Sequence, residues 1–577
     1  MSRRPAASRA GAEFFADPAE PTQRRYEALR AYLLDGLPVA AAAARFGYTT
    51  DTLASLVRDF RAGRRDFFVA GKPGPKTAPA KERVRPRVIE LRRAGRSAYE
   101  IAQTLAAEGT PLNRTGVAEL LAEEGFPRLW PRPQAERGLP RREVLPRAGL
   151  LDPALLPARS VSKVAGLALV LPDLVALDLP ALVGAAGYPG TTVIPAVNYL
   201  LSLLALKLVG MRRVSHVEDI AADPGAALFA GLTALPKTTA LTSYSYRLAH
   251  PRQQALLTEL GKASLRAGLV SGADFDLDFH AIMHWGEDVA LERHYVPRRS
   301  QRTRSVLSFF AQDADTHTLI YANADLTKAT QNAEVIAFAD HWKTICGHWP
   351  AQLVFDSRLT TQAHLATLNS RGIQFLTLRT RSPAVIRQIA AIPAAAYRQV
   401  TLDRTGAHRT PKIADTTTRL SAYPGPIRQL VITDLGHDQP TVLITNNTTS
   451  TPKNILARYA QRMTLEQRLG EAIRAFHIDA LAGAVPLNVD LDVTLSVLAH
   501  TLCAALRRRL PGYHTATPDT LQRRFLSTGG TIINNNPDGP ITIRLDRRTY
   551  SPVLRSANLP DTPIPWLGGR TIHYEYA

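Results

Sequence analysis

Three acidic residues in the second half of the chain, Asp278, Asp356 and Glu466, have the carboxylate groups that hard metal ions prefer. Asp278 lies in residues 274–280, where polar and apolar residues alternate strictly. The alternation predicts a strand with its three aspartates on one face. Carboxylates in a row repel one another unless water or a cation screens them, so this segment is either a cation-binding strand or an exposed acidic edge.

Two other elements must carry Asp356 and Glu466. Residues 352–355 predict a buried strand that ends at Asp356, before a helix from about residue 361 to 370. A carboxylate just beyond the carboxyl end of a strand is a favoured site position in open α/β sheets. Residues 454–476 predict a long helix on which Tyr459, Arg462 and Glu466 share one face. Taken alone, that stripe would also suit surface salt bridges.

In their order and spacing, these residues resemble the DDE transposases of bacterial insertion sequences, in particular the cut-and-paste group with a Tyr-x2-Arg-x3-Glu-x6-Lys motif. Here the motif residues are Tyr459, Arg462 and Glu466, with Ile473 in place of the lysine. The resemblance implies an α/β RNase H-like catalytic core with a β-rich insertion, and residues 371–450 carry the hairpin signals of such an insertion.

The same resemblance implies metal-dependent phosphodiester hydrolysis at transposon ends and strand transfer into target DNA. Asp278, Asp356 and Glu466 would hold two Mg²⁺ ions, for which Mn²⁺ would substitute. Such a pair of ions activates water and stabilises the leaving 3′ oxygen. Tyr459 and Arg462 would contact a phosphate near the scissile bond.

The first catalytic acid has two candidates on the same strand. Asp278 is preferred because residues 279–282 continue the strand beyond it and keep it inside the sheet. Asp276 is the reserve candidate.

A basic run follows this strand, with four arginines in residues 298–304. A solvated loop would explain the run, but phosphate contact is favoured beside a site that must hold DNA. The candidates are Arg298, Arg299, Arg302 and Arg304.

Charge points to nucleic acid as a partner. The 577 residues include 70 Lys and Arg against 50 Asp and Glu, a net charge of +20. By sequence, residues 1–150 contain 27 basic and 17 acidic residues, so this quarter of the chain carries half of the excess. Such an excess predicts attraction to a polyanion, and nucleic acid is the commonest one.

Within this region, residues 20–66 and 80–127 predict two helix-turn-helix modules, a plan in which the second helix of the motif enters the DNA major groove. In the second module, Ser97 and Glu100 predict a capping box, and either Asn113 or Thr115 begins the next helix. Two ordinary helical hairpins would give the same pattern. Candidate phosphate contacts are Arg58, Arg61, Arg92, Arg93 and Arg96.

The expected fold is multidomain. N-terminal all-α helix-turn-helix modules precede a proline- and arginine-rich linker at residues 128–160 and a helical packing or dimerisation domain at 161–270. The α/β core would occupy residues 271–510, including the insertion. Residues 511–577 form a C-terminal segment without a chemical interpretation.

Cysteine content and hydropathy bear on location. Two cysteines exclude a disulfide scaffold or a zinc cage and fit a reducing compartment. The longest apolar run, residues 193–211, is interrupted by Pro195, Asn198 and Lys207, so it predicts a buried helix rather than a membrane span. We expect a cytoplasmic, nucleoid-associated protein with no membrane partner.

The leading hypothesis is a DNA transposase that acts on terminal repeats and target DNA. The resemblance implies a homodimer on double-stranded DNA, because two ends must be joined. The alternatives are a catalytically inactive DNA-binding protein derived from a transposase and an RNase H-like nuclease.

Overall fold

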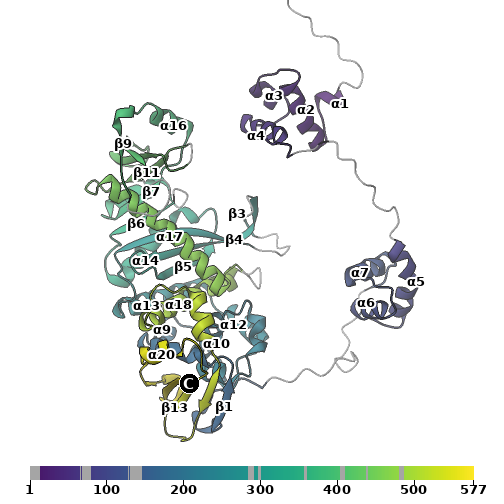
Figure 1. Ribbon diagram of the computed structural model, residues 1–577, viewed down its shortest axis with the longest axis vertical. Helices are drawn as coiled ribbons and strands as arrows, with labels where there is room; N and C mark the ends of the chain where they lie inside the picture. Colours follow the sequence, from purple (N-terminus) through teal and green to yellow (C-terminus); the bar gives the residue numbers. More distant parts are fainter. Residues whose placement is uncertain are drawn as a thin grey trace, which may run out of the picture. The chain divides into compact units, whose positions relative to one another are not determined.

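The structure is a computed structural model that describes residues 13–64, 67, 79–127, 129, 146–283, 291–296, 301–356, 360–402, 410–436, 439–479 and 486–576. The chain divides into two units, residues 1–142 and 143–577 (Figure 1). It is 48% helical and 18% strand, so its fold class is mixed, with the N-terminal helical region that the sequence predicts.

Module 1, predicted over residues 20–66, contains three helices: α2 (Pro21–Leu33), α3 (Val39–Arg45) and α4 (Thr50–Arg61). The turn between α3 and α4 passes through Gly47 with a φ of +70°, which glycine adopts without strain. Thr49 caps α4 by accepting a hydrogen bond from the Thr52 N–H at 3.2 Å. The buried core consists of Ala28, Leu29, Ala31, Ala42, Ala43, Phe46, Leu53, Leu56 and Val57. A short helix, α1 (Glu13–Ala16), precedes the module.

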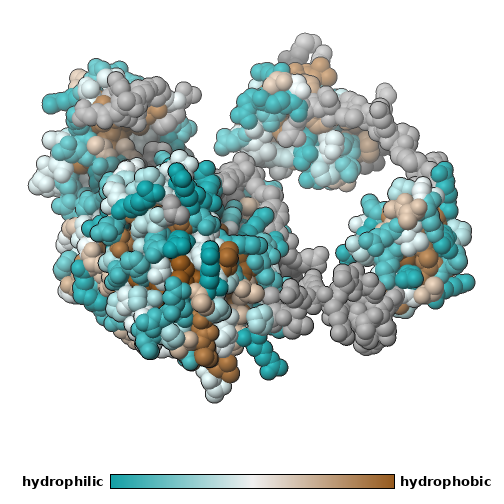
Figure 2. All heavy atoms as spheres, turned by 60° about the horizontal axis from the view of Figure 1, so that its bottom comes forward, coloured by the Kyte–Doolittle hydropathy of each residue, from teal (hydrophilic) through white to brown (hydrophobic). Residues whose placement is uncertain are grey.

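Module 2, predicted over residues 80–127, repeats the three-helix plan with α5 (Pro79–Arg93), α6 (Ala98–Ala107) and α7 (Arg114–Glu123). The predicted capping box is present, since the Ser97 N–H donates to Glu100 Oε2 at 2.6 Å and the Glu100 N–H to Ser97 Oγ at 3.3 Å. Asn113, rather than Thr115, caps α7. The visible face of both modules is mostly hydrophilic, as expected when apolar side chains form their cores (Figure 2).

A mixed sheet crosses the second unit. Its first strands are β2 (Asp274–Met283), β4 (Gln301–Asp313), β5 (Leu319–Leu326), β6 (Gln352–Phe355) and β7 (Gln374–Leu378). The order in space is β5–β4–β2–β6–β7. β2, β4 and β5 are antiparallel neighbours, whereas β6 and β7 are parallel to β2. Helices α14 (Glu334–Cys346) and α15 (Gln362–Ser370) make the crossovers that parallel strands require.

The residues predicted to form a β-rich insertion extend this sheet beyond β7. The added strands are β11 (Thr441–Thr445), β10 (Pro426–Thr433), β9 (Lys412–Arg419) and β8 (Tyr397–Gln399), in that spatial order. A short helix, α16 (Pro383–Ala390), packs on them through Val385 and Ile389.

Helices cover both faces of the sheet. Helix α17 (Pro452–Phe476) lies across one face, where Ile455 and Leu456 share a cluster with Val354 of β6 (Figure 1). On the opposite face, the Phe275 ring of β2 meets the Trp342 ring of α14 with centroids 4.6 Å apart. Burial on both sides fixes the strand register, because a shift of one residue would turn the apolar set of β2 to the other face.

The middle region is mainly helical. It contains α8 (Leu171–Ala176), α9 (Leu179–Ala185), α10 (Ala196–Leu208), α11 (Pro224–Ala230), α12 (Thr238–Ser245) and α13 (His250–Arg266). As predicted, the apolar run forms a buried helix, and Pro195 is the N-cap of α10. One hydrophobic cluster joins this region to the sheet and to α18 (Pro486–Arg509). In the described chain, the part of α18 from residue 488 is long and apolar enough to cross a membrane, but 94% of that stretch is buried in the protein.

The linker expected to reach residue 160 ends earlier in the structure. Leu150 forms a β-bridge with Leu232, and β1 (Arg159–Ser162) pairs with β12 (Gly530–Ile533) of the C-terminal segment. The pairing partner of β1 lies far along the chain, so local composition could not reveal the strand. This second sheet also contains β13 (Ile541–Leu545), β14 (Thr562–Pro563) and β15 (Thr571–Tyr576). Helices α19 (Pro518–Leu521) and α20 (Ser551–Ala557) accompany it.

The C-terminal end of α17 is held by two distant segments. Lys207 Nζ of α10 donates to the Phe476 carbonyl at 2.7 Å and forms an ion pair with Asp492 of α18, also at 2.7 Å. Gln522 Nε2 donates to the Ala475 carbonyl at 3.1 Å. These donors satisfy carbonyl groups that a helix end would otherwise leave without partners.

Candidate functional site

The register of two parallel strands places Asp278 beside Asp356. Leu277 of β2 is paired with Phe355, the last residue of β6. Asp278 is the next residue of β2, and Asp356 directly follows β6. Neighbouring strands lie about 4.8 Å apart, so these residues are adjacent at the carboxyl edge of the sheet. Both are partly exposed. Two acids that are 78 positions apart in the sequence therefore meet at one edge.

Helix α17 joins β2 through two ion pairs, which we call the two rungs. In the first rung, Arg458 Nη1 lies 2.7 Å from Asp276 Oδ1. In the second, Arg462 Nη2 lies 3.0 Å from Asp278 Oδ1, and Arg462 Nε donates to the Leu277 carbonyl at 3.4 Å. Four residues advance a helix by about 6 Å, and two residues advance a strand by about 6.7 Å. The side chains on successive turns of α17 are therefore spaced like alternate residues of β2.

The two rungs differ in burial. Asp276 is 1% exposed, and its Oδ2 atom is buried with no hydrogen-bond partner among the described residues. Burial raises the pKa of Asp276, and Arg458 opposes that shift. Asp278 has an 18% exposed side chain, and its Oδ1 atom also accepts the Phe279 N–H at 2.9 Å. Of the two candidates for the first acid, Asp278 is the more open and Asp276 belongs to a buried ion pair.

Arg458 is the residue of this site that the sequence interpretation missed. Its signal was present in the spacing, because Arg458 precedes Arg462 by four residues and so shares its helix face. Residue 466 lies one further turn along α17, and its side chain is outside the described part of the structure. Among the side chains that are described, no group of three or more His, Cys, Asp or Glu residues could hold a metal ion.

The two motif residues expected to contact a phosphate lie inside the protein in this structure. Arg462 is 4% exposed and donates a hydrogen bond to Asp278 Oδ1 at 3.0 Å. Tyr459 is partly buried and packs against the cluster that contains Val354 and Leu456.

The predicted basic run lies at the end of the sheet. Arg298 and Arg299 fall outside the described residues. Arg302 is exposed and Arg304 is partly buried, both on the first residues of β4. Both arginines are paired with β3 (Arg293–Val296), beyond the residues of β4 that pair with β2 and Asp278.

In the modules, most of the predicted arginines are at the surface. Arg58 has a 69% exposed side chain that donates to Ser55 Oγ at 2.9 Å. Arg61, Arg93 and Arg96 are also exposed.

Arg92 differs from its predicted role as a phosphate contact. It is 8% exposed, and its guanidinium donates to the carbonyl oxygens of Arg96 at 3.2 Å and Pro127 at 2.6 Å. The arginine therefore ties the end of α5 to the chain that follows α7, because free carbonyl oxygens attract cations at a helix end.

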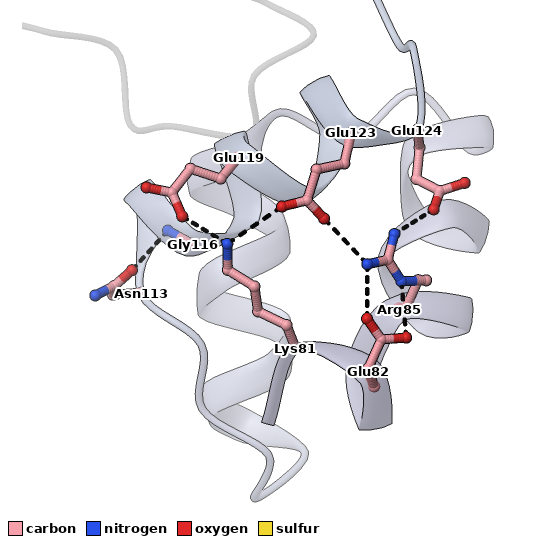
Figure 3. Close-up of polar contacts among 8 residues, drawn as sticks. All are labelled: Lys81, Glu82, Arg85, Asn113, Gly116, Glu119, Glu123 and Glu124. Atoms are coloured by element: carbon pink, nitrogen blue, oxygen red, sulfur yellow. Dashed lines mark hydrogen bonds and ion pairs between the residues drawn. The ribbon is translucent and has the colours of Figure 1, made fainter. Parts of the chain in front are cut away.

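Helix α7 of module 2 has an acidic surface whose charges are paired with α5 (Figure 3). Lys81 Nζ lies 2.6 Å from Glu119 Oε2 and 3.5 Å from Glu123 Oε1. Arg85 lies 3.0 Å from Glu123 Oε2 and also forms an ion pair with Glu124. The helix in the recognition position of this module thus presents paired carboxylates along this surface, while its exposed cation, Arg114, stands at its first residue.

A cavity of about 280 Å³ between α10, α12 and α18 lies away from the acids of β2 and β6. Its lining is mainly apolar, and the Lys207–Asp492 ion pair borders it. Arg212 and Arg213 also line the cavity.

Comparison with known proteins identifies one part of the chain. Residues 24–76 match the family of helix-turn-helix domains. The matched range covers most of module 1 and continues past its end. No curated protein is significantly similar to the chain. Module 1 is therefore a helix-turn-helix domain, and double-stranded DNA is the partner that this domain indicates.

Proposed function

We propose that this protein is a DNA transposase of the DDE type, in which module 1 binds DNA and the second unit cuts and joins it. The observation that carries the proposal is the adjacency of Asp278 and Asp356 at the sheet edge, next to the helix that bears Tyr459, Arg462 and Glu466. This is the arrangement of acids that the resemblance implies.

The order of elements supports an RNase H-like core. Three antiparallel strands are followed by a helix, a parallel strand, a second helix and another parallel strand. The β-rich segment from β8 to β11 lies between Asp356 and Glu466 in the sequence, where the proposed family has its insertion.

The acids of the proposed site are the kind of donor that Mg²⁺ prefers. Asp278 and Asp356 offer carboxylate oxygens at adjacent positions, and hard divalent ions prefer such ligands. With Glu466 as the third acid, the bound ions would activate a water molecule and stabilise the leaving 3′ oxygen. Before they bind, Arg462 balances the charge of Asp278, and the Arg458–Asp276 pair holds α17 against β2.

The test is cleavage of a duplex that carries the DNA flanking the gene. Asp356→Ala and Glu466→Ala should abolish nicking in Mg²⁺ or Mn²⁺ while the proteins remain folded. A matched control is Asp340→Ala, which removes a half-exposed acid of α14, on the other face of the sheet. Cleavage at the parental rate by either site variant would exclude the proposal.

One observation favours a second candidate function, that of a DNA-binding protein without chemistry. Arg462 already supplies Asp278 with a cation inside the protein. Specific binding of flanking DNA with no metal-dependent cleavage would support this function. An RNase H-like nuclease would instead cleave RNA hybrids in preference to duplex DNA, whereas module 1 favours duplex DNA.

A further inference from the structure

The sheet ends in a two-stranded ribbon beyond the proposed site. β3 (Arg293–Val296) pairs with Gln301–Arg304 of β4, and these four pairs define the β3–β4 ribbon. The last pair between β2 and β4 is Met283 with Ser305, so the ribbon projects past the carboxyl end of β2 (Figure 1). It therefore leaves the sheet at the same edge as Asp278 and Asp356.

Three arginines share one face of the ribbon. Arg293 is directly opposite Arg304, and Tyr295 is opposite Arg302. Side chains of opposite residues point to the same side, and alternate residues of one strand do so as well. One face therefore carries Arg293, Arg302 and Arg304, and the other carries His294 and Thr303. Arg293 was not among the arginines that the sequence predicted to contact phosphate.

This arginine face continues the face of the proposed acids. Along β4, Arg304 and Phe310 are separated by an even number of residues, and Phe310 is paired with Asp278. The β2–β4 pairing runs without a register shift from Asp313 to Ser305. The arginines and Asp278 therefore lie on one side of the sheet.

The charge on this face has no counterpart in the described part of the chain, where no carboxylate forms an ion pair with any of the three arginines. Arg293 and Arg304 are like charges at directly opposite positions, which destabilises a two-stranded pair. Hydrogen bonds hold the base of the ribbon in place. The Lys328 N–H donates to Glu292 Oε2 at 2.9 Å, and His294 Nδ1 lies 3.0 Å from Ser305 Oγ. A ribbon that is held in place and whose positive charge is unpaired among the described residues fits an anionic partner.

We propose that the β3–β4 ribbon binds the phosphates of the DNA duplex that enters the site, with Arg293 and Arg304 placed on either side of the backbone. This inference rests on the proposed function for the position of the DNA. Six residues of β4 separate Arg304 from the level of Asp278, and eight separate Arg302 from it. At about 3.4 Å for each strand residue and each base pair, the contact lies roughly six to eight base pairs from the scissile phosphate.

The test compares variants of the full chain on a random-sequence duplex of about 40 base pairs in EDTA, so that cleavage plays no part. Arg293→Gln/Arg304→Gln should reduce the slope of log affinity against log salt by about 2, because each lost phosphate contact removes about 0.9. From 50 to 200 mM salt, its affinity should then fall roughly tenfold less than that of the parent. Arg293→Lys/Arg304→Lys should keep most of the slope.

The matched control removes the same charge elsewhere. Arg159→Gln/Arg266→Gln changes two exposed arginines, one on β1 and one at the end of α13, before β2 begins. This control should retain the parental slope. Without DNA, the glutamine variant of the ribbon should unfold at no lower temperature than the parent, since it relieves the repulsion between like charges.

An unchanged salt slope in Arg293→Gln/Arg304→Gln, or an equal loss in the control, would overturn the proposal. If the ribbon variant shows a reduced salt slope but the parent protein never cleaves DNA, the ribbon remains a DNA contact and the proposed enzymatic function is contradicted. If the ribbon binds DNA and the protein also cleaves it, a duplex that ends fewer than about six base pairs beyond the scissile bond should bind the parent and the ribbon variant with equal affinity.

Discussion

The two N-terminal modules share a three-helix plan and differ in what their third helices present. Helix α4 of module 1 carries the exposed cations Arg58 and Arg61. Helix α7 of module 2 carries one exposed arginine, Arg114, at its first residue, and its Glu119 and Glu123 are paired with Lys81 and Arg85 of α5. The plan fixes how the helices pack, whereas the exposed residues decide which partner the surface attracts. We therefore expect module 1, the part that matches a known helix-turn-helix family, to supply most of the DNA affinity.

The largest expected effect comes from emptying each core. Leu53 in module 1 and Leu120 in module 2 are fully buried, so replacement of either by alanine should cost its own module about 3 kcal/mol in free energy of unfolding. Thermal unfolding of the full chain should show both losses. DNA affinity should fall strongly for Leu53→Ala and little for Leu120→Ala. Equal losses of affinity would show that both modules bind DNA.

Surface arginines should separate the modules next. Arg58→Gln/Arg61→Gln in α4 should weaken duplex binding by about 2 kcal/mol, roughly 30-fold, and lower the salt slope by about 2. Arg93→Gln/Arg96→Gln removes the same charge from module 2 and should change little. Fluorescence anisotropy with a labelled duplex measures both. A greater loss in the module 2 variant would reverse the assignment.

Loss of a helix cap should lower stability to a similar extent in both modules. Thr49→Ala removes the cap of α4, and Ser97→Ala breaks the capping box of α6. Each should cost about 1 kcal/mol of the stability of its module. The measurement is thermal unfolding with DNA binding as a second readout. Thr49 stands at the start of the recognition helix, so only its variant should also affect affinity.

The smallest effect concerns pH and module 2. A hydrogen bond from Arg87 lowers the pKa of Glu108 below its ordinary value of 4.5. A lowered folded-state pKa contributes stability that is present above the unfolded pKa and is lost as pH falls through the folded one. Glu108→Gln should flatten the acid limb of the unfolding profile of module 2, by less than the loss of a cap. An unchanged acid limb would mean that this pair contributes nothing measurable.

Much of the fold could be predicted from local patterns. The alternation in residues 274–280 predicted β2, the spacing around Glu466 predicted α17, and Ser97 with Glu100 predicted a capping box that the structure contains. These signals lie within one element, where periodicity and capping act over a few residues. The pairing of β1 with β12 joins segments about 370 residues apart, and no local pattern encodes it.

The candidate site was predictable only in part for the same reason. Each acid could be assigned to its element, but the register that brings Asp278 beside Asp356 depends on packing on both faces of the sheet. The first rung joins Arg458 to Asp276 across 182 positions, and a charged residue on a helix does not reveal its partner. The burial of Arg92 could not be predicted for the same reason, because its acceptor, the Pro127 carbonyl, lies in the chain that follows α7.

The donors at the end of α17 limit how this protein can be divided. Lys207 and Gln522 lie outside residues 271–510, yet they hold the final carbonyls of the helix that carries the third acid. A shortened catalytic fragment with those boundaries would lose both anchors and leave the last carbonyl groups of the helix without these donors. A functional fragment must therefore keep the middle and C-terminal segments together with the core, whereas the front modules form a separate unit.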